Sequence, residues 1–303
     1  NNMRYSFHHL LVLTALVFST LPILGCGGNN DSNPNIPDFK PQPQPTEDYK
    51  YAKAPGTIRL MTYNSFYCKS NTSSKIFSKE HTRDFGEVIK ALHPDVIAIQ
   101  ELDSACNERS QRYLLQEIQQ AAGDDYNIVF GSAAPFDGGK IGCGVMYKKT
   151  LQPTAIRQVA LPGHEKRKLI LISFPQFNFI GTHFDLETRH RQSSIDLLLH
   201  ELPSLPNAPV FFAGDLNDSP MWKAEVSAFP KLLQNFTILS ATTGSLPDEP
   251  NETIDYVLVD KAHQNKVEVK QTHVVKQLYM NGSVKETKTV SDHYPVFVDV
   301  KLK

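Results

Sequence analysis

Apolar residues between positions 57 and 303 recur with two different spacings, and together these predict a mixed α/β fold. Phe85, Ile89 and Leu92 fall on one face of a helix, whereas residues 209–214 (PVFFAG) are apolar throughout, as in a buried strand. The pattern predicts helices at 82–92, 109–122 and 187–202, and strands at 57–63, 95–100, 127–131, 143–148, 154–161, 168–174, 177–182, 209–214, 254–259, 267–275 and 296–302.

So many apolar strands need partners on both of their faces. Two sheets packed face to face, with helices outside, would bury them. The sequence shows no internal repeat, and Asn281-Gly282 is a hairpin signal. We therefore expect one α/β domain over residues 56–303.

The N-terminal segment has the pattern of a secretory signal. Arg4 is followed by an apolar stretch over residues 10–24, which is too short for a confident membrane span. The stretch ends in Leu24-Gly25-Cys26, which resembles a bacterial lipobox whose cysteine is lipidated; the alternative is a cleaved signal with an incidental cysteine. We expect a signal and lipobox over 1–26 and a protein anchored only by its lipid at the cell envelope, on the outer membrane or surface of a diderm bacterium.

Residues 27–55 have the composition of an extended, disordered tether. Little apolar surface is present there, and proline at this density blocks helix and sheet hydrogen bonds. The prolines are Pro34, Pro37, Pro41, Pro43, Pro45 and Pro55.

Composition and cysteine content narrow the classes of protein. The 40% hydrophobic and 21% charged residues exclude collagen, coiled coil and wholesale disorder. The net charge of −1 disfavours nucleic-acid binding through bulk charge. Beyond Cys26 the chain has three cysteines; an oxidising compartment would permit a Cys68–Cys106 disulfide, and Cys143 lies in an apolar strand.

Polar side chains follow several apolar strands at the point where each strand is expected to end. Each has an ordinary interpretation alone: Asn64 could be a turn residue, and a lone His183 is more often structural than catalytic. Loops at one rim of a sheet can converge on a ligand, however, and the repeated pattern favours such a site. The residues are Asn64, Gln100, Glu101, His183, Asp185, Asp215, Asn217, Asp255, Asp292 and His293.

This set of motifs resembles the endonuclease/exonuclease/phosphatase superfamily, the DNase-I-like metal-dependent phosphoesterases, and closely resembles its small bacterial lipoprotein branch. The most specific motifs are Gly214-Asp215-Leu216-Asn217 and Ser291-Asp292-His293-Tyr294-Pro295, with Ile99-Gln100-Glu101 before them. The resemblance covers residues 57–303. It implies a four-layer α/β sandwich of two mainly antiparallel sheets flanked by helices, with the site at one edge of the sheets.

A divalent cation makes chemical sense for such a site. A phosphate ester is anionic, and a hard cation with oxygen ligands neutralises the charge that repels an attacking oxygen. Glu101 is our first choice as a ligand, with the amide oxygen of Asn64, and the resemblance adds Asp292. We expect Mg²⁺, for which Mn²⁺ could substitute. Zn²⁺ fits less well, because no His/Cys cluster has ligand spacing.

The resemblance also implies the roles of five catalytic residues. Asp215 would orient or deprotonate the attacking water, and Asn217 would hold that water or a phosphate oxygen. His293 would contact the phosphate or act as general acid or base, and Asp255 would pair with a histidine and keep it charged. His183 would stabilise charge on the equatorial oxygens from the other side.

The chain departs from the nuclease pattern in one respect. Nuclease members often have a glutamate paired with the first histidine, and we find no counterpart in residues 138–146. Asp185, two residues after His183, could replace it or be a loop acid. Arg167, at a strand start, and Arg191, early in a helix, are candidate phosphate ligands, although both are also explained as solvated surface residues.

These observations predict a Mg²⁺-dependent phosphodiesterase or phosphomonoesterase. From residue 50 onward the chain has 29 basic and 28 acidic residues (31 − 2 and 32 − 4). This near balance does not indicate a broad basic surface for binding a polyanion. A nuclease therefore remains an alternative that is not favoured. A lipid phosphodiesterase is not favoured either, because we find no long aromatic loop of the kind typical of membrane-inserting lipid phosphodiesterases. A non-catalytic binding module is the least favoured alternative. We expect a monomer.

Overall fold

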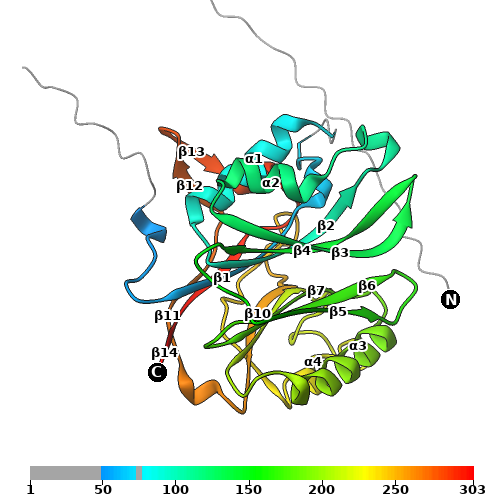
Figure 1. The fold of residues 1–303 in the computed structure, drawn as a ribbon, viewed down its shortest axis with the longest axis vertical. Coiled ribbons are helices and arrows are strands. Elements are labelled where there is room, and N and C mark those ends of the chain that lie inside the picture. The colour runs from blue at the N-terminus through cyan, green and yellow to red at the C-terminus, as the bar shows by residue number, and fades with distance from the viewer. Residues whose placement is uncertain (1–48, 73–76) are drawn as a thin grey trace, which may run out of the picture. The chain divides into compact units, whose positions relative to one another are not determined.

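Two β-sheets stack face to face between two layers of helices (Figure 1). The computed structural model describes residues 49–72 and 77–303. The first sheet has the order β11 (Val267–Val274), β14 (Val296–Leu302), β1 (Ile58–Asn64), β2 (Val96–Ser104), β4 (Gly139–Lys148) and β3 (Tyr126–Phe136). The second has the order β5 (Ala155–Leu161), β6 (Arg167–Ser173), β7 (Asn178–His183), β8 (Val210–Asp215), β10 (Asp255–Asp260) and β9 (Phe236–Ile238).

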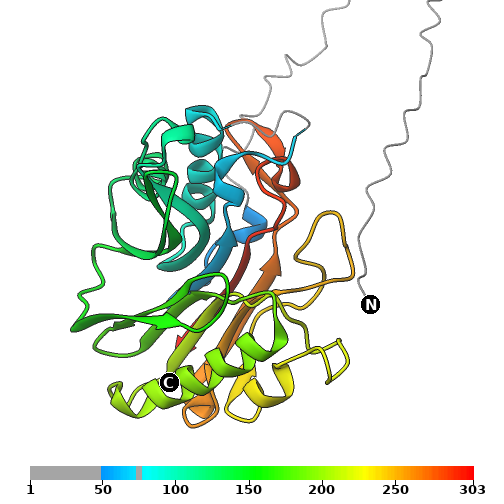
Figure 2. The same cartoon turned by 90° about the vertical axis from the view of Figure 1, so that its right-hand side faces the viewer.

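The helices cover the two outer faces of this stack. Helices α1 (Lys79–Leu92) and α2 (Leu114–Ala122) lie on the first sheet, and α3 (Thr188–Glu201) and α4 (Phe229–Leu232) lie on the second (Figures 1 and 2). Pairing within each sheet is antiparallel except for β1 with β2 and β7 with β8. The predicted four-layer sandwich of two mainly antiparallel sheets is therefore confirmed.

A small hairpin completes the strand content. β12 (Gln277–Met280) pairs with β13 (Ser283–Glu286). Asn281 and Gly282 connect them with φ angles of 51° and 78°, the left-handed conformations that a tight hairpin turn requires. The Asn281-Gly282 prediction is thus confirmed.

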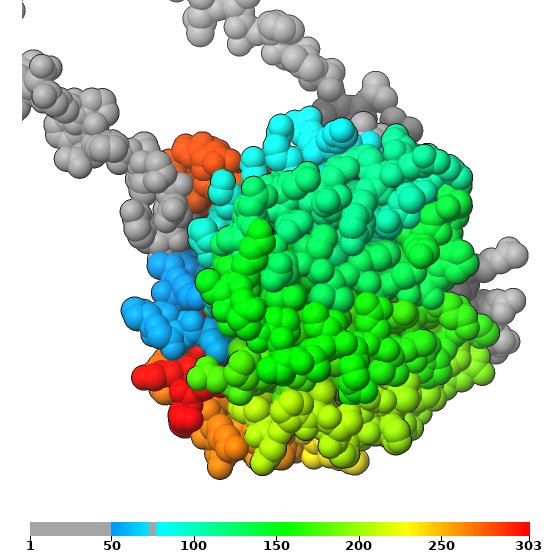
Figure 3. All heavy atoms as spheres, viewed as in Figure 1, coloured from blue at the N-terminus to red at the C-terminus, as the bar shows by residue number. Residues whose placement is uncertain are grey.

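Alternation along the strands divides the apolar residues among three cores. In β1, Met61 and Tyr63 face α1, and the ring of Tyr63 stacks on Phe85 with centroids 4.2 Å apart. Leu60 points to the opposite side, into the layer between the sheets. Side chains fill the space between the sheets on the face that Figure 3 shows.

The two parallel pairs bring the functional strand ends to one edge. β1 and β2 run in the same direction, as do β7 and β8 in the other sheet. The carboxyl ends of the pairs meet, since Gln100 Nε2 donates to the Thr182 carbonyl oxygen at 3.1 Å across the sheets. Residues that follow these strands are therefore brought together.

Several predicted element boundaries differ from the structure, among them those of β2 and α2. β2 does not end at Gln100 but continues to Ser104, with a register shift between Ile99 and Leu102. Helix α2 begins at Leu114 rather than 109, because Ser110 and Gln111 have positive φ angles that interrupt the helix.

The folded part also begins earlier than predicted. Residues 49–55, assigned to the tether, include Tyr51, which is buried against His273 and Phe297. An aromatic side chain with a matching apolar site overrides the proline-rich composition around it. The predicted signal and lipobox, and tether residues 27–48, lie outside the described residues. Among the described helices, none has the length and hydropathy needed to cross a membrane.

A buried ion pair stabilises the first sheet where β1 begins, at the opposite end of this strand from Asn64. Arg59 Nε and Nη2 donate to the two carboxylate oxygens of Asp299 at 2.7 and 2.8 Å, and Nη1 donates to the Leu92 carbonyl at 2.6 Å. The guanidinium carbon lies 4.0 Å from the centre of the Phe297 ring. One side chain thus connects β1, β14 and the end of α1.

We expect Asp299→Ala to lower the free energy of unfolding by about 3–5 kcal/mol, because Arg59 would stay buried without its counter-ion. Urea unfolding followed by circular dichroism measures this loss. Arg83→Ala is the matched control, since Arg83 is 60% exposed beside Glu80 and Glu87 and its loss should barely move the midpoint. Equal midpoints for the two variants would contradict this account of Asp299.

Candidate active site

The predicted catalytic residues converge at one edge of the two sheets. Asn64, His183 and Asp215 end β1, β7 and β8, and Asp255 opens β10 directly opposite Asp215. His293 lies in the segment that enters β14. The antiparallel strands start at the edge where the parallel strands finish, and this topology brings residues from distant parts of the chain together.

Asp215 lies at the centre of this group. Its Oδ1 accepts the backbone N–H of Asn217 at 2.9 Å, and its Oδ2 accepts Asn64 Nδ2 at 3.0 Å. The same Oδ2 lies 3.5 Å from His183 Nε2 and 3.7 Å from His293 Nε2. Burial, followed by the nearby carboxylate of Asp255, raises the pKa of Asp215. Asp215 therefore has the position and basicity of a general base.

His293 is held as a cation. Its Nδ1 lies 2.8 Å from Asp255 Oδ2, as the resemblance implied. Burial opposes the charge, but Asp255 and then Asp215 raise the pKa of His293 to about 10. Atoms of Asp215, Asp255 and His293 that could hold a metal lie within 4.8 Å of one another. The hydrogen bond to Asp255 favours the protonated imidazole, and a protonated imidazole has no free lone pair for a metal.

His183 has the opposite electrostatic character. Asn217 Nδ2 lies 3.1 Å from His183 Nε2, so Nε2 accepts and the ring proton is on Nδ1. Nδ1 is buried and has no hydrogen-bond partner among the described residues. Burial, then the Arg167 charge, lowers the pKa of His183 well below its usual value. The site therefore contains one charged and one neutral imidazole.

Two carboxylates flank the centre on the side of β2. Burial and then Asp292 raise the pKa of Glu101, and burial likewise raises the pKa of Asp292. Glu101 is turned toward the site by the register shift in β2, where its φ is 54°. Two carboxylates that repel each other at a half-buried position form a donor set suited to a hard divalent cation.

Asn64 is oriented differently from the predicted ligand. Its Nδ2 faces Glu101 Oε1 at 3.2 Å as well as Asp215, and its oxygen accepts the N–H of Phe66 at 2.9 Å. An amide nitrogen cannot bind a cation. The amide stabilises the carboxylates here, and it would have to rotate to present its oxygen to a metal.

Of the candidate phosphate ligands, only Arg167 lies beside the centre. Its charge lowers the pKa values of both His183 and Glu101, and its Nη2 contacts the carboxylate of Glu165. Arg191 was predicted wrongly: it is 2% exposed and is saturated by Asp218 Oδ2 at 2.9 Å, the Val226 carbonyl at 2.8 Å and neighbouring loop groups. It braces the loop that carries Asn217 and cannot reach a phosphate.

Asp185 does not replace the missing glutamate. Its Oδ2 accepts the N–H of Glu165 at 3.1 Å, and its Oδ1 accepts the N–H of Glu187 at 2.8 Å. Its carboxylate is therefore occupied with two loops and makes no hydrogen bond with His183. The strand ends at His183, so the two-residue spacing no longer places Asp185 on the same face.

Three further side chains support the site, of which Gln100 was named in the sequence analysis and Ser291 and Asp218 were given no role. Ser291 Oγ donates to the Asn64 carbonyl at 2.7 Å and accepts the N–H of His293 at 3.2 Å. Asp218 accepts Arg191 and the N–H of Ala228 at 2.6 Å, and Gln100 joins the two sheets. Ser291 and Gln100 lie inside the motifs, which was the only signal available.

The three cysteines in the described part of the chain are free, so the Cys68–Cys106 disulfide is absent. Cys68 packs in the core under α1, whereas Cys106 Sγ lies 3.3 Å from the Phe136 carbonyl near the turn between β3 and β4. The two thiols occupy different environments. Cys143 is buried, as expected.

A model of the endonuclease/exonuclease/phosphatase family matches residues 61–293. This protein belongs to that family. Members are hydrolases that act on phosphate esters and generally depend on divalent metals. Among curated proteins, no sequence matches the chain.

Solved structures share the fold at low identity. A family member from Bacteroides vulgatus is 18% identical with a TM-score of 0.62, covering 82% of this chain and 99% of that one. A mannosyl-6-phosphatase from Bacteroides thetaiotaomicron is 16% identical with a TM-score of 0.59, covering 80% and 99%. The human nocturnin catalytic domain with bound sulfate is 16% identical with a TM-score of 0.58, covering 86% and 100%.

We expect Asp255→Asn to shift the alkaline limb of the pH–rate profile of this family member to lower pH. In the native protein His293 keeps its proton until the pH approaches about 10. Without the Asp255 carboxylate, the largest contribution that favours the charge is lost while burial still opposes it, so the pKa of His293 falls toward its ordinary value of about 6.5. The kcat/KM of the variant should therefore decline as pH rises through neutrality. An alkaline limb at the native position would show that Asp255 does not maintain the charge.

Proposed function

We propose that this protein is a Mg²⁺-dependent hydrolase of phosphate esters at the cell envelope, in which a water molecule attacks phosphorus. The observation that carries the proposal is the position of Asp215, a buried carboxylate between a neutral and a protonated imidazole. Environments that push the pKa values of neighbouring groups apart are typical of acid–base sites.

Glu101 and Asp292 would hold the ion, with Asn64 as a third ligand after rotation of its amide. Few protein ligands suffice, because Mg²⁺ retains several waters. When bound, the ion would neutralise phosphate charge and polarise a phosphoryl oxygen. Mn²⁺ would serve the same role.

Asp215 would take the proton of the attacking water. The N–H of Asn217 on its Oδ1 fixes the plane of the carboxylate, which leaves Oδ2 directed into the site. The φ of 47° at Asn217 permits this close turn. Asn217 Nδ2 also donates to the Phe184 carbonyl at 2.9 Å, so the turn is attached to the end of β7.

The two histidines would have different roles in phosphate binding. His293, as a cation, would donate a charge-assisted hydrogen bond to a phosphate oxygen and could protonate the leaving group. His183 is neutral and accepts from Asn217, so its main effect would be to orient that amide. Arg167, beside His183, would supply the positive charge on this side.

A small or exposed phosphate ester is the favoured substrate class. The near balance of charge after residue 49 gives no extended basic surface for nucleic acid. The absence of a carboxylate on His183 Nδ1 within the described ranges departs from the nuclease pattern and supports the same choice. A neighbour in fold is a phosphatase acting on a mannosyl 6-phosphate. A nuclease is the second candidate.

The N-terminal sequence supports anchoring by lipid at Cys26, in the manner of the small lipoprotein branch, with residues 27–48 as a tether. The enzyme would then act outside the cytoplasm. We expect it to act as a monomer.

The purified protein should hydrolyse one class of ester in a panel of bis-p-nitrophenyl phosphate, p-nitrophenyl phosphate, plasmid DNA, sphingomyelin and inositol phosphates when Mg²⁺ is present, and EDTA should abolish this activity. Asp215→Asn should lower kcat by roughly two to four orders of magnitude, because it removes the general base. Asp196→Asn, on the exposed surface of α3, is the matched control.

Retained activity in Asp215→Asn would reject the role of this residue. Metal-dependent cleavage of DNA alone would favour the nuclease. Failure to hydrolyse any ester, together with a thermal midpoint that Mg²⁺ does not move, would favour a binding module.

We expect Cys26→Ser to release the protein from membranes, because its thiol can no longer be acylated. Fractionation of cells expressing the native and variant proteins, with quantitative immunoblotting, measures the distribution. A variant that still sediments with membranes would show that something other than a lipid on Cys26 holds it there.

A further inference from the structure

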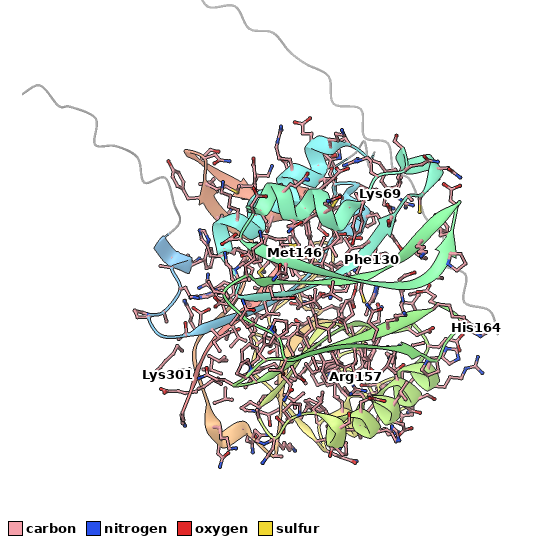
Figure 4. All side chains as sticks on the ribbon, viewed as in Figure 1. Lys69, Phe130, Met146, Arg157, His164 and Lys301 are labelled. Carbon is pink, nitrogen blue, oxygen red and sulfur yellow. The ribbon has the colours of Figure 1, made fainter. Side chains whose placement is uncertain are left out.

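A second group of metal-binding side chains lies outside the proposed catalytic site. His164 belongs to the loop between β5 and β6 and is visible at the outer end of that hairpin in Figure 4. Glu187 precedes α3, and His190 lies in the first turn of this helix. One donor atom from each residue can be chosen so that all three lie within 4.8 Å of one another.

The separations match those around a small cation. His164 Nε2 lies 3.5 Å from Glu187 Oε1, and His190 Nδ1 lies 3.9 Å from Glu187 Oε2. A tetrahedral ion with ligands at about 2.1 Å holds its donor atoms about 3.4 Å apart. Small rotations of the exposed His164 and Glu187 side chains toward the half-buried His190 would bring the donor atoms to these separations.

Asp185 fixes the backbone of both segments that carry the ligands. It accepts the N–H of Glu165, next to His164, at 3.1 Å and the N–H of Glu187 at 2.8 Å. The loop can approach this closely because residue 163 is glycine: a Cβ there would lie 2.4 Å from Asp185 Oδ2, and its φ is 146°. The carboxylate that fails to pair with His183 thus organises this second group.

The donor atoms have unmet or replaceable partners. His190 Nδ1 is buried, and its nearest partner is Asp185 Oδ1 at 3.3 Å. Arg189 donates from Nε to Glu187 at 2.8 Å, and its Nη2 lies 3.2 Å from His164 Nε2. The Arg189 guanidinium is thus a cation that this group of side chains already holds. Arg189 is 69% exposed and can withdraw into water when a metal arrives.

We propose that His164, Glu187 and His190 bind a divalent transition-metal ion of the Zn²⁺ class. Two imidazoles and one carboxylate are borderline ligands that favour such an ion over Mg²⁺, and water would complete the coordination. The ion would join the β5–β6 loop to α3. Because this loop leads directly into Arg167, the metal would restrain an arginine of the proposed phosphate site.

Isothermal titration of the purified protein with Zn²⁺, in excess Mg²⁺, tests the proposal. One Zn²⁺ should bind per chain, and His164→Ala and His190→Ala should each weaken binding by about tenfold or more. His200→Ala, an exposed histidine on the same helix, should bind as the native protein does. Arg189→Ala should bind Zn²⁺ more tightly, because its competing charge is gone; misfolding could not produce this gain.

His293→Gln separates this site from the catalytic one. Zn²⁺ binding that survives His293→Gln but not His190→Ala supports the proposal, as does X-ray absorption showing two imidazoles on the zinc. Binding that is lost in His293→Gln, unchanged in His164→Ala and His190→Ala, or absent from the native protein overturns it.

Discussion

The structure depends on keeping the carboxylate of Asp215 buried beside that of Asp255. Two buried carboxylates repel, and each loses its hydration, so the arrangement needs specific donors. Asn64 Nδ2 and the Asn217 N–H supply hydrogen bonds to Asp215, and the His293 cation lies between the two acids. Removal of any of these leaves charge uncompensated. These donors therefore compensate the buried charge where β1, β8, β10 and the segment before β14 meet, beside the apolar core that the same strands share.

The two-sheet architecture makes that balance attainable. Each sheet contains one parallel pair, with α1 or α3 in the crossover, and the antiparallel neighbours begin where those pairs end. Gln100 and Ser291 then fix the two sheets and the His293 segment to the common edge. The same edge continues to the β5–β6 loop, where Asp185 joins the loop to α3. The candidate phosphate site and the His164–Glu187–His190 group thus lie along the same edge of the sheets. Carboxylate oxygens, which are hard ligands, predominate in the first, and imidazole nitrogens, which are softer, predominate in the second.

Most of the candidate site could be located from the sequence because its residues lie within local motifs. Asp215 and Asn217 form one turn, and Asp292 and His293 are adjacent, so short-range sequence carried the signal. Arg191 and Asp185 failed for a common reason: a charged residue near an active-site motif can serve the substrate or the fold, and only its hydrogen-bond partners distinguish the two. The predicted Cys68–Cys106 disulfide was wrong for a similar reason: a position in a loop does not determine which side chains surround a thiol, and Cys68 packs into the core under α1.

The sequence by itself determined the layers, the strand and helix types and the motifs, because periodicity and turn residues act over a few positions. Tertiary structure alone decided which imidazole is charged. The motifs gave His293 and His183 different roles but not their charges: His293 Nδ1 lies beside Asp255, whereas His183 has no carboxylate on Nδ1 among the described residues. It also decided that His164 and His190, 26 positions apart, can act together. Charge and coordination depend on distances in space, and the chain encodes these only through the packing of all its elements.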